Sequence, residues 1–93
     1  MKDETNDSAI QQFKEKLEAQ HKFPGKYKFK FIVAQEKKAE LLSSILPGRA
    51  RWQEKPSRNG KYLSMTAEVK MKSSEEVVAV YVQAKKIEGI ISL

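Results

Sequence analysis

Two spacings of hydrophobic residues alternate along the chain, and each predicts a different kind of element. Residues on one face of a helix recur every three or four positions, whereas those on one face of a strand recur every second position. Helical spacing occupies three segments, 9–20, 36–46 and 74–87. Strand-like patterns occupy four segments, 27–33, 49–55, 61–71 and 90–93. The predicted order is a helix followed by β-α-β-β-α-β.

Residues that cap or break helices mark the ends of the predicted helices. Ser8, followed three positions later by Gln11, is a capping box, and the same pattern recurs at Ser73 and Glu76. Helix-stopping sequences follow all three segments: Phe23-Pro24-Gly25, Pro47-Gly48 and Gly89. The first helix has a thin apolar stripe, so we expect it to pack on its own domain or on a second subunit.

The segment between the second and third predicted strands carries a hairpin signal. Asn59-Gly60 between two alternating runs predicts a two-residue type I′ turn, in which both residues have positive φ. A turn centred there makes the numbers of paired residues sum to 119. In this register Trp52 faces Ala67 on the core side, and Arg51 faces Glu68 on the other side. Apolar residues then meet apolar ones along the whole ladder from residue 49 onward.

These elements predict an α+β fold of the ferredoxin-like kind. Two helices would cover one face of a four-stranded antiparallel sheet, with the first and third strands in the centre and the second and fourth at the edges. We expect an N-terminal tail and amphipathic helix over 1–22, and a ferredoxin-like domain over 23–93. At 93 residues, the chain has room for one hydrophobic core.

Composition narrows the setting in which this domain works. The chain has no cysteine, which excludes disulfides and thiolate metal sites, and its apolar runs are far shorter than the roughly 20 residues of a membrane span. The first residues lack the basic-then-apolar order of a secretion signal. We therefore expect a cytoplasmic protein without membrane contacts.

Positive charge is concentrated in the body of the chain. Of 18 Lys and Arg and 12 Asp and Glu, residues 1–8 hold one and three respectively, so residues 9–93 carry 17 cations and nine anions, a net charge of +8. A field of this sign attracts phosphate-rich or acidic partners, although it also serves solubility.

Basic residues gather at two predicted places, which are the candidate sites for an anion or a partner. The sheet face opposite the helices would display six cations and one anion. Its candidate residues are Lys28, Lys30, Arg49, Arg51, Tyr62 and Ser64. The second place is the hairpin loop, whose backbone amides and two cations would cradle an anion. The loop residues are Ser57, Arg58, Asn59, Gly60 and Lys61. A solvated or covered sheet face, and a turn that needs Asn-Gly, explain the same residues without a ligand.

Side chains typical of catalysis or metal binding are sparse. Both aspartates lie among the first eight residues, and the single histidine, His21, has no partner at a metal-like spacing. No Ser-His-acid set, P-loop or paired-carboxylate motif is present. Acylphosphatases share the predicted topology but depend on an arginine-bearing loop after the first strand, where this chain has Ala34-Gln35-Glu36-Lys37. We therefore expect no enzyme activity, metal or cofactor.

Four sequence features together point to a known family. They are Phe23-Pro24 before the aromatic strand, Pro47-Gly48, the segment 55–64 with its pattern Pro-Ser-x-x-Gly-x-Tyr-x-Ser, and the ending Ile87-Glu88-Gly89-Ile90. In these features the chain resembles the YbeD-like family of small, uncharacterised bacterial proteins. The resemblance implies a ferredoxin-like fold similar to the ACT-type regulatory domains of amino-acid enzymes, without an established reaction. Ligand-binding ACT domains tend to have glycine after the first strand, where this chain has Ala34-Gln35-Glu36.

Two functions are consistent with these observations. The first is a small, non-catalytic binding or regulatory module that acts through protein contacts or a small anionic effector, with a homodimer as one assembly. The alternative is a nucleic-acid-binding domain that uses the basic open face of the sheet. RNA-recognition domains of this topology stack bases on aromatic residues of the two central strands, and here the open face would offer only Tyr62.

Overall fold

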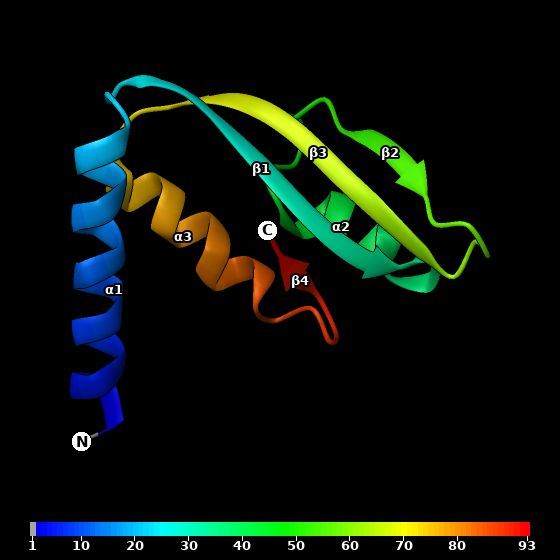
Figure 1. The fold of residues 1–93 in the computed structure, drawn as a ribbon, viewed down its shortest axis with the longest axis horizontal. Helices are drawn as coiled ribbons and strands as arrows, with labels where there is room; N and C mark the ends of the chain where they lie inside the picture. The colour runs from blue at the N-terminus through cyan, green and yellow to red at the C-terminus, as the bar shows by residue number, and fades with distance from the viewer. Residues whose placement is uncertain (1) are drawn as a thin grey trace.

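Four strands form one antiparallel sheet in the computed structural model, and three α-helices lie beside it (Figure 1). The structure describes the backbone of residues 2–93 and the side chains of residues 8–93. The elements are α1 (Lys2–Gln20), β1 (Gly25–Ala34), the 3-10 turn η1 (Gln35–Lys37), α2 (Lys38–Ser44), β2 (Gln53–Pro56), β3 (Tyr62–Met71), α3 (Ser74–Ala84) and β4 (Ile91–Ser92). The order in the sheet is β2-β3-β1-β4, so the predicted α+β class, with the first and third strands central, is confirmed.

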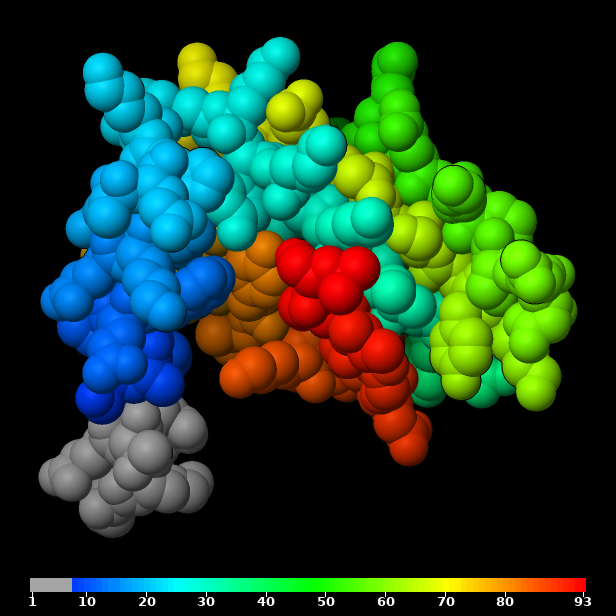
Figure 2. Space-filling view, in the orientation of Figure 1, coloured from blue at the N-terminus to red at the C-terminus, as the bar shows by residue number. Residues whose placement is uncertain are grey.

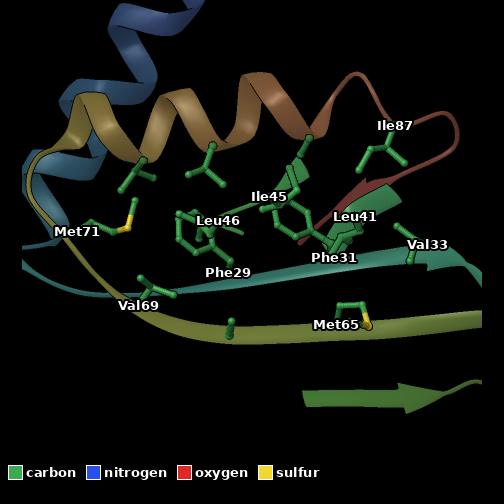
Figure 3. Packing of buried hydrophobic residues seen from close by; sticks show 14 of the residues in the cluster. Phe29, Phe31, Val33, Leu41, Ile45, Leu46, Met65, Val69, Met71 and Ile87 are labelled. Carbon is green, nitrogen blue, oxygen red and sulfur yellow. The ribbon is translucent and has the colours of Figure 1, made fainter. Parts of the chain in front are cut away.

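The central strands β1 and β3 form the longest ladder of the sheet. Ten residue pairs join them, from Gly25↔Met71 to Ala34↔Tyr62. Alternate residues on both strands are fully buried, among them Phe29, Phe31 and Met65. These side chains point toward α2 and α3, which cover the same face of the sheet (Figure 3). The core therefore lies between one sheet face and the two-helix layer, and the opposite face is open.

Helix α3 begins at the predicted capping box. The Ser73 hydroxyl accepts a hydrogen bond from the backbone N–H of Glu76 at 3.2 Å, which satisfies one of the free donors of the first turn. The Glu76 carboxylate accepts in turn from the backbone N–H of Lys72 at 2.7 Å. The predicted start of this helix is confirmed, and its last residue, Ala84, precedes the positive-φ Gly89 by five positions.

Helix α1 is longer than predicted and packs on its own domain. It begins at Lys2, so the prediction that Ser8 caps the helix is wrong. Asp and Glu near the start favour the N-terminal end of a helix, which explains why helical backbone continues past Ser8. The buried Leu17 joins the core, while the Lys14 ammonium pairs with the Glu75 carboxylate on α3 at 3.3 Å.

Strand β2 is shorter than its alternating pattern predicts. It starts at Gln53, so the predicted pairs Trp52–Ala67 and Arg51–Glu68 do not form. A turn occupies the preceding segment, because the backbone N–H groups of residues 49 and 50 both donate to the carbonyl of Leu46. The Trp52 ring nevertheless lies on the core side as predicted. It is half-buried, with its centroid 6.1 Å from that of Phe31.

The hairpin keeps the predicted register but has a different turn. The pairs from Gln53↔Thr66 to Pro56↔Leu63 all sum to 119. Of the two predicted turn residues, Gly60 has φ +76°, whereas Asn59 does not have positive φ. The loop contains four residues, 58–61, closed by a hydrogen bond from Ser57 N–H to the Tyr62 carbonyl at 2.8 Å. The prediction of a type I′ turn is wrong, but both loops share one centre and therefore give the same register.

Gly60→Ala should lower the free energy of unfolding by about 1 kcal/mol, because alanine is strained at a φ of +76°. Urea titration followed by circular dichroism measures the change. Lys61→Ala is the matched control, since it removes an exposed neighbouring side chain without altering the backbone requirement. Equal midpoints for the two variants would contradict the four-residue turn.

Leu17→Ala should lower the free energy of unfolding by about 2 kcal/mol or more, because the leucine side chain is 4 % exposed and joins α1 to the core. Lys16→Ala, at an exposed position on the same helix, should leave stability within about 0.5 kcal/mol of the original. Thermal melts of both variants test the docking of α1. A Leu17→Ala protein as stable as the Lys16→Ala protein would show that α1 does not dock.

Candidate functional site

The open face of the sheet, away from α2 and α3, brings together part of the predicted site. Side chains of β1 and β3 that do not enter the core alternate onto this face. The cross-strand pairs there are Lys26↔Lys70, Lys28↔Glu68, Lys30↔Thr66, Ile32↔Ser64 and Ala34↔Tyr62. Lys55 joins the face from β2, opposite Ser64. The predicted residues Lys28, Lys30, Tyr62 and Ser64 therefore share one surface.

The open-face lysines differ from four basic residues packed near the helices, Lys14, Lys37, Lys38 and Arg49, in having no ion pair among the described side chains. Around the helices, Lys37 contacts Glu40 and Glu88, Lys38 contacts Glu54, and Lys14 contacts Glu75. Among the side chains of residues 8–93, no carboxylate lies within ion-pair distance of the exposed lysines of the open face. These lysines are Lys26, Lys28, Lys30, Lys55 and Lys70. Their charge is therefore available to an external anion.

Arg49 and Arg51 do not join the open face, because β2 begins after them. The Arg49 guanidinium donates to the Glu76 carboxylate at 3.0 Å and to the backbone carbonyl of Lys70 at 3.1 Å. It thus donates a hydrogen bond to a carbonyl of β3 that β2 is too short to reach, and its bond to Glu76 links this segment to the first turn of α3. Arg51 is exposed in the connection before β2.

The hairpin loop uses its polar groups internally. The Asn59 side-chain oxygen accepts from the Ser57 hydroxyl at 3.0 Å and from the backbone N–H of Lys61 at 3.1 Å. The Ser57 hydroxyl accepts from the backbone N–H of Tyr62 at 3.1 Å. These bonds explain Ser57 and Asn59 as turn-forming residues, and the positive φ of Gly60 explains the glycine. The side chains of Arg58 and Lys61 are exposed.

An apolar patch adjoins the lysines on the open face, and it includes Tyr62, which was predicted for this face. Ile91 on β4 pairs with Ile32 on β1, and the Tyr62 ring emerges from the end of β3 on the same face. Ile91 and Tyr62 are 51 % and 49 % exposed, which places them among the few large apolar side chains that reach solvent. The alternation of segments 27–33 and 61–71 places Ile32 and Tyr62 on this face, whereas the position of Ile91 beside Ile32 comes from the register of β4.

A second feature missed from the sequence is an aromatic cluster centred on Tyr81 of α3. The Tyr81 ring contacts Phe13 of α1 at 5.4 Å and Phe29 of β1 at 5.5 Å between centroids. Its hydroxyl lies 3.1 Å from that of Tyr27. Burial, followed by the hydrogen bond with Tyr27, raises the pKa of Tyr81 above its ordinary value of 10.0. Tyr81 therefore remains a neutral phenol at physiological pH.

The described part of the chain offers neither clustered metal ligands nor a membrane span. Within it, no three His, Cys, Asp or Glu side chains come together as a metal site would require. None of its helices is both long enough and apolar enough to cross a bilayer. His21 is exposed, with its ring 5.0 Å from that of Tyr27.

The fold and surface define a small α+β domain with an open, lysine-rich sheet face. Comparison with known proteins places it more closely: residues 18–93 match the family described as proteins of unknown function, DUF493, and the chain belongs to that family. YbeD-like proteins belong to the same family, so the resemblance inferred from the sequence is confirmed. No curated protein and no solved structure matches the chain.

Glu76→Gln should weaken the protein at neutral pH but change it little in acid. The pKa of Glu76 lies below its ordinary value of 4.5, first because the Lys72 N–H donates to its carboxylate and further because Arg49 binds it. Because the pKa of Glu76 is lowered in the folded state, its ionised carboxylate stabilises the fold above pH 4.5. That stabilisation is lost as the pH falls through the pKa of the folded state.

Urea unfolding at pH 7 and pH 3 measures the difference between Glu76→Gln and the unaltered protein. The difference should be largest at pH 7 and shrink at pH 3. Glu75→Gln is the control, because Glu75 precedes Glu76 on the same turn but forms an exposed pair with Lys14. A pH-independent difference for Glu76→Gln would rule out the charged form of its carboxylate as the stabilising one.

Proposed function

We propose that the chain is a non-catalytic, ferredoxin-like binding module that holds an acidic surface of a partner protein on its open sheet face. The sheet order β2-β3-β1-β4, with α2 and α3 on one face, supports the ferredoxin-like assignment. The observation that carries the function is the adjacency of unpaired lysines and an exposed apolar patch on that face. A regulatory role in the cytoplasm, similar to that of ACT-type domains, fits a module of this kind.

The lysine arrangement favours a negatively charged partner. Lys26 and Lys70 lie directly opposite each other, and like charges at opposed positions destabilise an antiparallel ladder. Lys28 faces Glu68, the acidic residue of this face, yet the two do not form an ion pair. An acidic partner would relieve this repulsion, and long-range attraction to the basic body would speed its association.

The apolar patch favours a protein over a nucleic acid. Ile32, Tyr62 and Ile91 provide an apolar centre beside a charged rim, which is the usual composition of a protein interface. Base stacking needs several aromatic rings on the exposed sheet face. Here Phe29 and Phe31 are buried beneath the helices, so Tyr62 is the aromatic residue available on β1 and β3.

Self-association through the same face is disfavoured by charge. Two copies joined face to face would bring the lysines of β1 and β3 into opposition, and these two strands offer a single glutamate, Glu68, to offset them. A partner with acidic side chains around an apolar contact complements the face in both respects. A homodimer, if one forms, would therefore use another surface.

Site-specific photo-crosslinking tests this proposal. A photoreactive phenylalanine analogue replaces Tyr62 on the open face, and the matched control carries it at Ala79, an exposed position on α3. In cells that make the protein naturally, the Tyr62 probe should give a discrete protein adduct that is absent with the Ala79 probe. Adding Lys28→Glu and Lys30→Glu should reduce the adduct at least about tenfold, because these changes reverse two charges at the contact.

The same charge reversal at two lysines outside the open face, Lys85→Glu and Lys86→Glu in the turn after α3, should leave the adduct unchanged. The adduct should also weaken as ionic strength rises, since exposed charges are screened by salt. An adduct that nuclease removes would contradict the protein partner and favour the nucleic-acid alternative. Equal loss with both lysine pairs would reduce the effect to overall charge and would contradict a role for the open face.

A further inference from the structure

One edge of β1 is only partly covered by β4. The Leu93 N–H donates to the Lys30 carbonyl at 2.9 Å, and beyond this bond residues 25–29 have no partner on the β4 side among the described strands. Alternate residues of an antiparallel strand direct both their N–H and C=O groups to the same edge. Lys26 and Lys28 therefore direct theirs to the edge that the Lys30 carbonyl faces, where no described backbone group pairs with them.

A groove of about 660 Å³ lies on the helix side of this edge, between α1, α3 and β4. Figure 2 shows the hollow, with α1 in blue, α3 in orange and the C-terminal residues in red. It opens because the two helices diverge: Leu17 is buried, whereas Phe13 and Ile10, closer to the N-terminus of α1, are half-buried. Its lining is mainly apolar and includes Ile10, Phe13, Tyr27, Val78 and Val82.

A strand added beside residues 25–29, in the line of β4, would have two different faces. Side chains alternate across a strand, so those opposite Phe29 and Tyr27 would enter the groove, while those opposite Lys28 and Lys26 would lie on the open face. We propose that this edge of β1 binds an extended segment of a partner protein as an added antiparallel strand, in which apolar residues alternate with acidic ones.

The groove favours apolar side chains on one face of the added strand. Val82 is 45 % exposed on α3, and Ile10 and Phe13 are half-buried on α1. Side chains entering from the strand would cover these groups, and removing apolar surface from water is favourable. When a peptide adds to a sheet edge, main-chain hydrogen bonds hold it and pockets for its alternate side chains select its sequence.

The lysines favour acidic side chains on the other face. Lys26 is opposite Lys70 and Lys28 is opposite Glu68, and none of the three lysines has an ion pair among the described side chains. A carboxylate opposite Lys26 or Lys28 on a neighbouring strand would form a favourable cross-strand pair. A second copy of β1 would instead bring lysines against lysines at this edge, so pairing between two copies is disfavoured.

Strand addition deepens the proposed function and rests on it for the acidic character of the partner. The proposed function requires contact with the open face, whereas strand addition also requires the free backbone of residues 25–29 and the groove. The two can therefore fail separately. A synthetic peptide, used in place of the unidentified partner, separates them.

Titration with the peptide acetyl-Ser-Val-Glu-Val-Glu-Val-Ser-amide, followed in ¹H–¹⁵N correlation spectra of the full chain, tests strand addition. The peptide should produce saturable shifts of amides in residues 25–29 and in the groove. Hydrogen exchange at the Lys26 and Lys28 amides should slow at least about tenfold, because these N–H groups face the added strand. The Tyr27 and Phe29 amides, which face β3, should change less than about twofold.

Modified peptides test the backbone and the alternation separately. The Leu93 N–H bonds the Lys30 carbonyl, so the two glutamate N–H groups should bond Lys28 and Lys26 in the same way. N-methylation of both glutamates should weaken binding at least about tenfold, whereas N-methylation of the second and third valines, whose N–H groups point away from β1, should change it less than about threefold. The peptide acetyl-Ser-Val-Val-Glu-Glu-Val-Ser-amide, with the same composition but no alternation, should bind at least about tenfold more weakly.

Paired variants of the protein test its two contact surfaces. Lys26→Glu with Lys28→Glu should reverse the preference, so that the protein binds acetyl-Ser-Val-Lys-Val-Lys-Val-Ser-amide more tightly than the glutamate peptide. Val82→Glu should weaken binding of the glutamate peptide at least about tenfold, because it places a charge in the apolar lining. Ala79→Glu, at an exposed position of the same helix outside the groove, should leave binding unchanged.

Three results would overturn strand addition. The first is the absence of saturable shifts with the glutamate peptide, and the second is equal affinity for the two N-methylated peptides. The third is a shift of the groove amides with protein concentration alone, which would show that a second copy occupies the groove. A specific adduct at Tyr62 together with any of these results would leave the proposed function standing, whereas peptide binding without that adduct would contradict the proposed function alone.

Discussion

The register of β1 against β3 determines which of two surfaces each side chain of the central strands occupies. In the observed register Phe29 and Phe31 enter the core together with Met65, while Lys28 and Lys30 face outward. A slip of β1 by one residue would bury lysines and expose phenylalanines. The ten-pair ladder therefore creates the hydrophobic core and the charged open face at the same time. Neither surface can be altered by changing strand pairing without loss of the other.

Tyr81 connects this sheet to the rest of the molecule. Its ring contacts Phe13 on α1 as well as Phe29 and Phe31 on β1, so three elements meet at one side chain of α3. The thin apolar stripe of α1 would not hold an isolated helix in water. Packing against α3 supplies the missing burial, and the divergence of the helices beyond this contact forms the groove.

The sequence predicted the parts of the fold that depend on local patterns. Alternation located β1 and β3, and the centre of the hairpin at residues 59 and 60 set the pairing of β2 with β3. It failed where a contact distant in sequence decides the outcome. The alternating pattern from residue 49 predicts a strand. In the structure, however, the Arg49 side chain donates a hydrogen bond to the Lys70 carbonyl, and the backbone N–H groups of residues 49 and 50 bond to the Leu46 carbonyl in a turn, so this segment does not pair with the sheet.

The candidate site shows the same division. The lysines of the open face follow from strand alternation, whereas the apolar patch needs the register of β4, and the groove needs the crossing of α1 over α3. Three residues predicted for the site, Arg49, Ser57 and Asn59, form intramolecular side-chain hydrogen bonds that shape the chain itself. Residue type alone cannot distinguish such bonds from ligand contacts.

The short edge strands have a consequence for behaviour in concentrated solution. A long, unpaired strand edge templates the addition of another chain and so promotes aggregation. Here β4 is two residues long, and β2 is four residues long and ends in proline. Beyond the start of β2, the guanidinium of Arg49 donates a hydrogen bond to the Lys70 carbonyl of β3. Residues 25–29 of β1 have no partner among the described strands on the β4 side, and Lys26 and Lys28, which alternate along this segment, place charges at that edge that oppose the addition of another strand of the same charge.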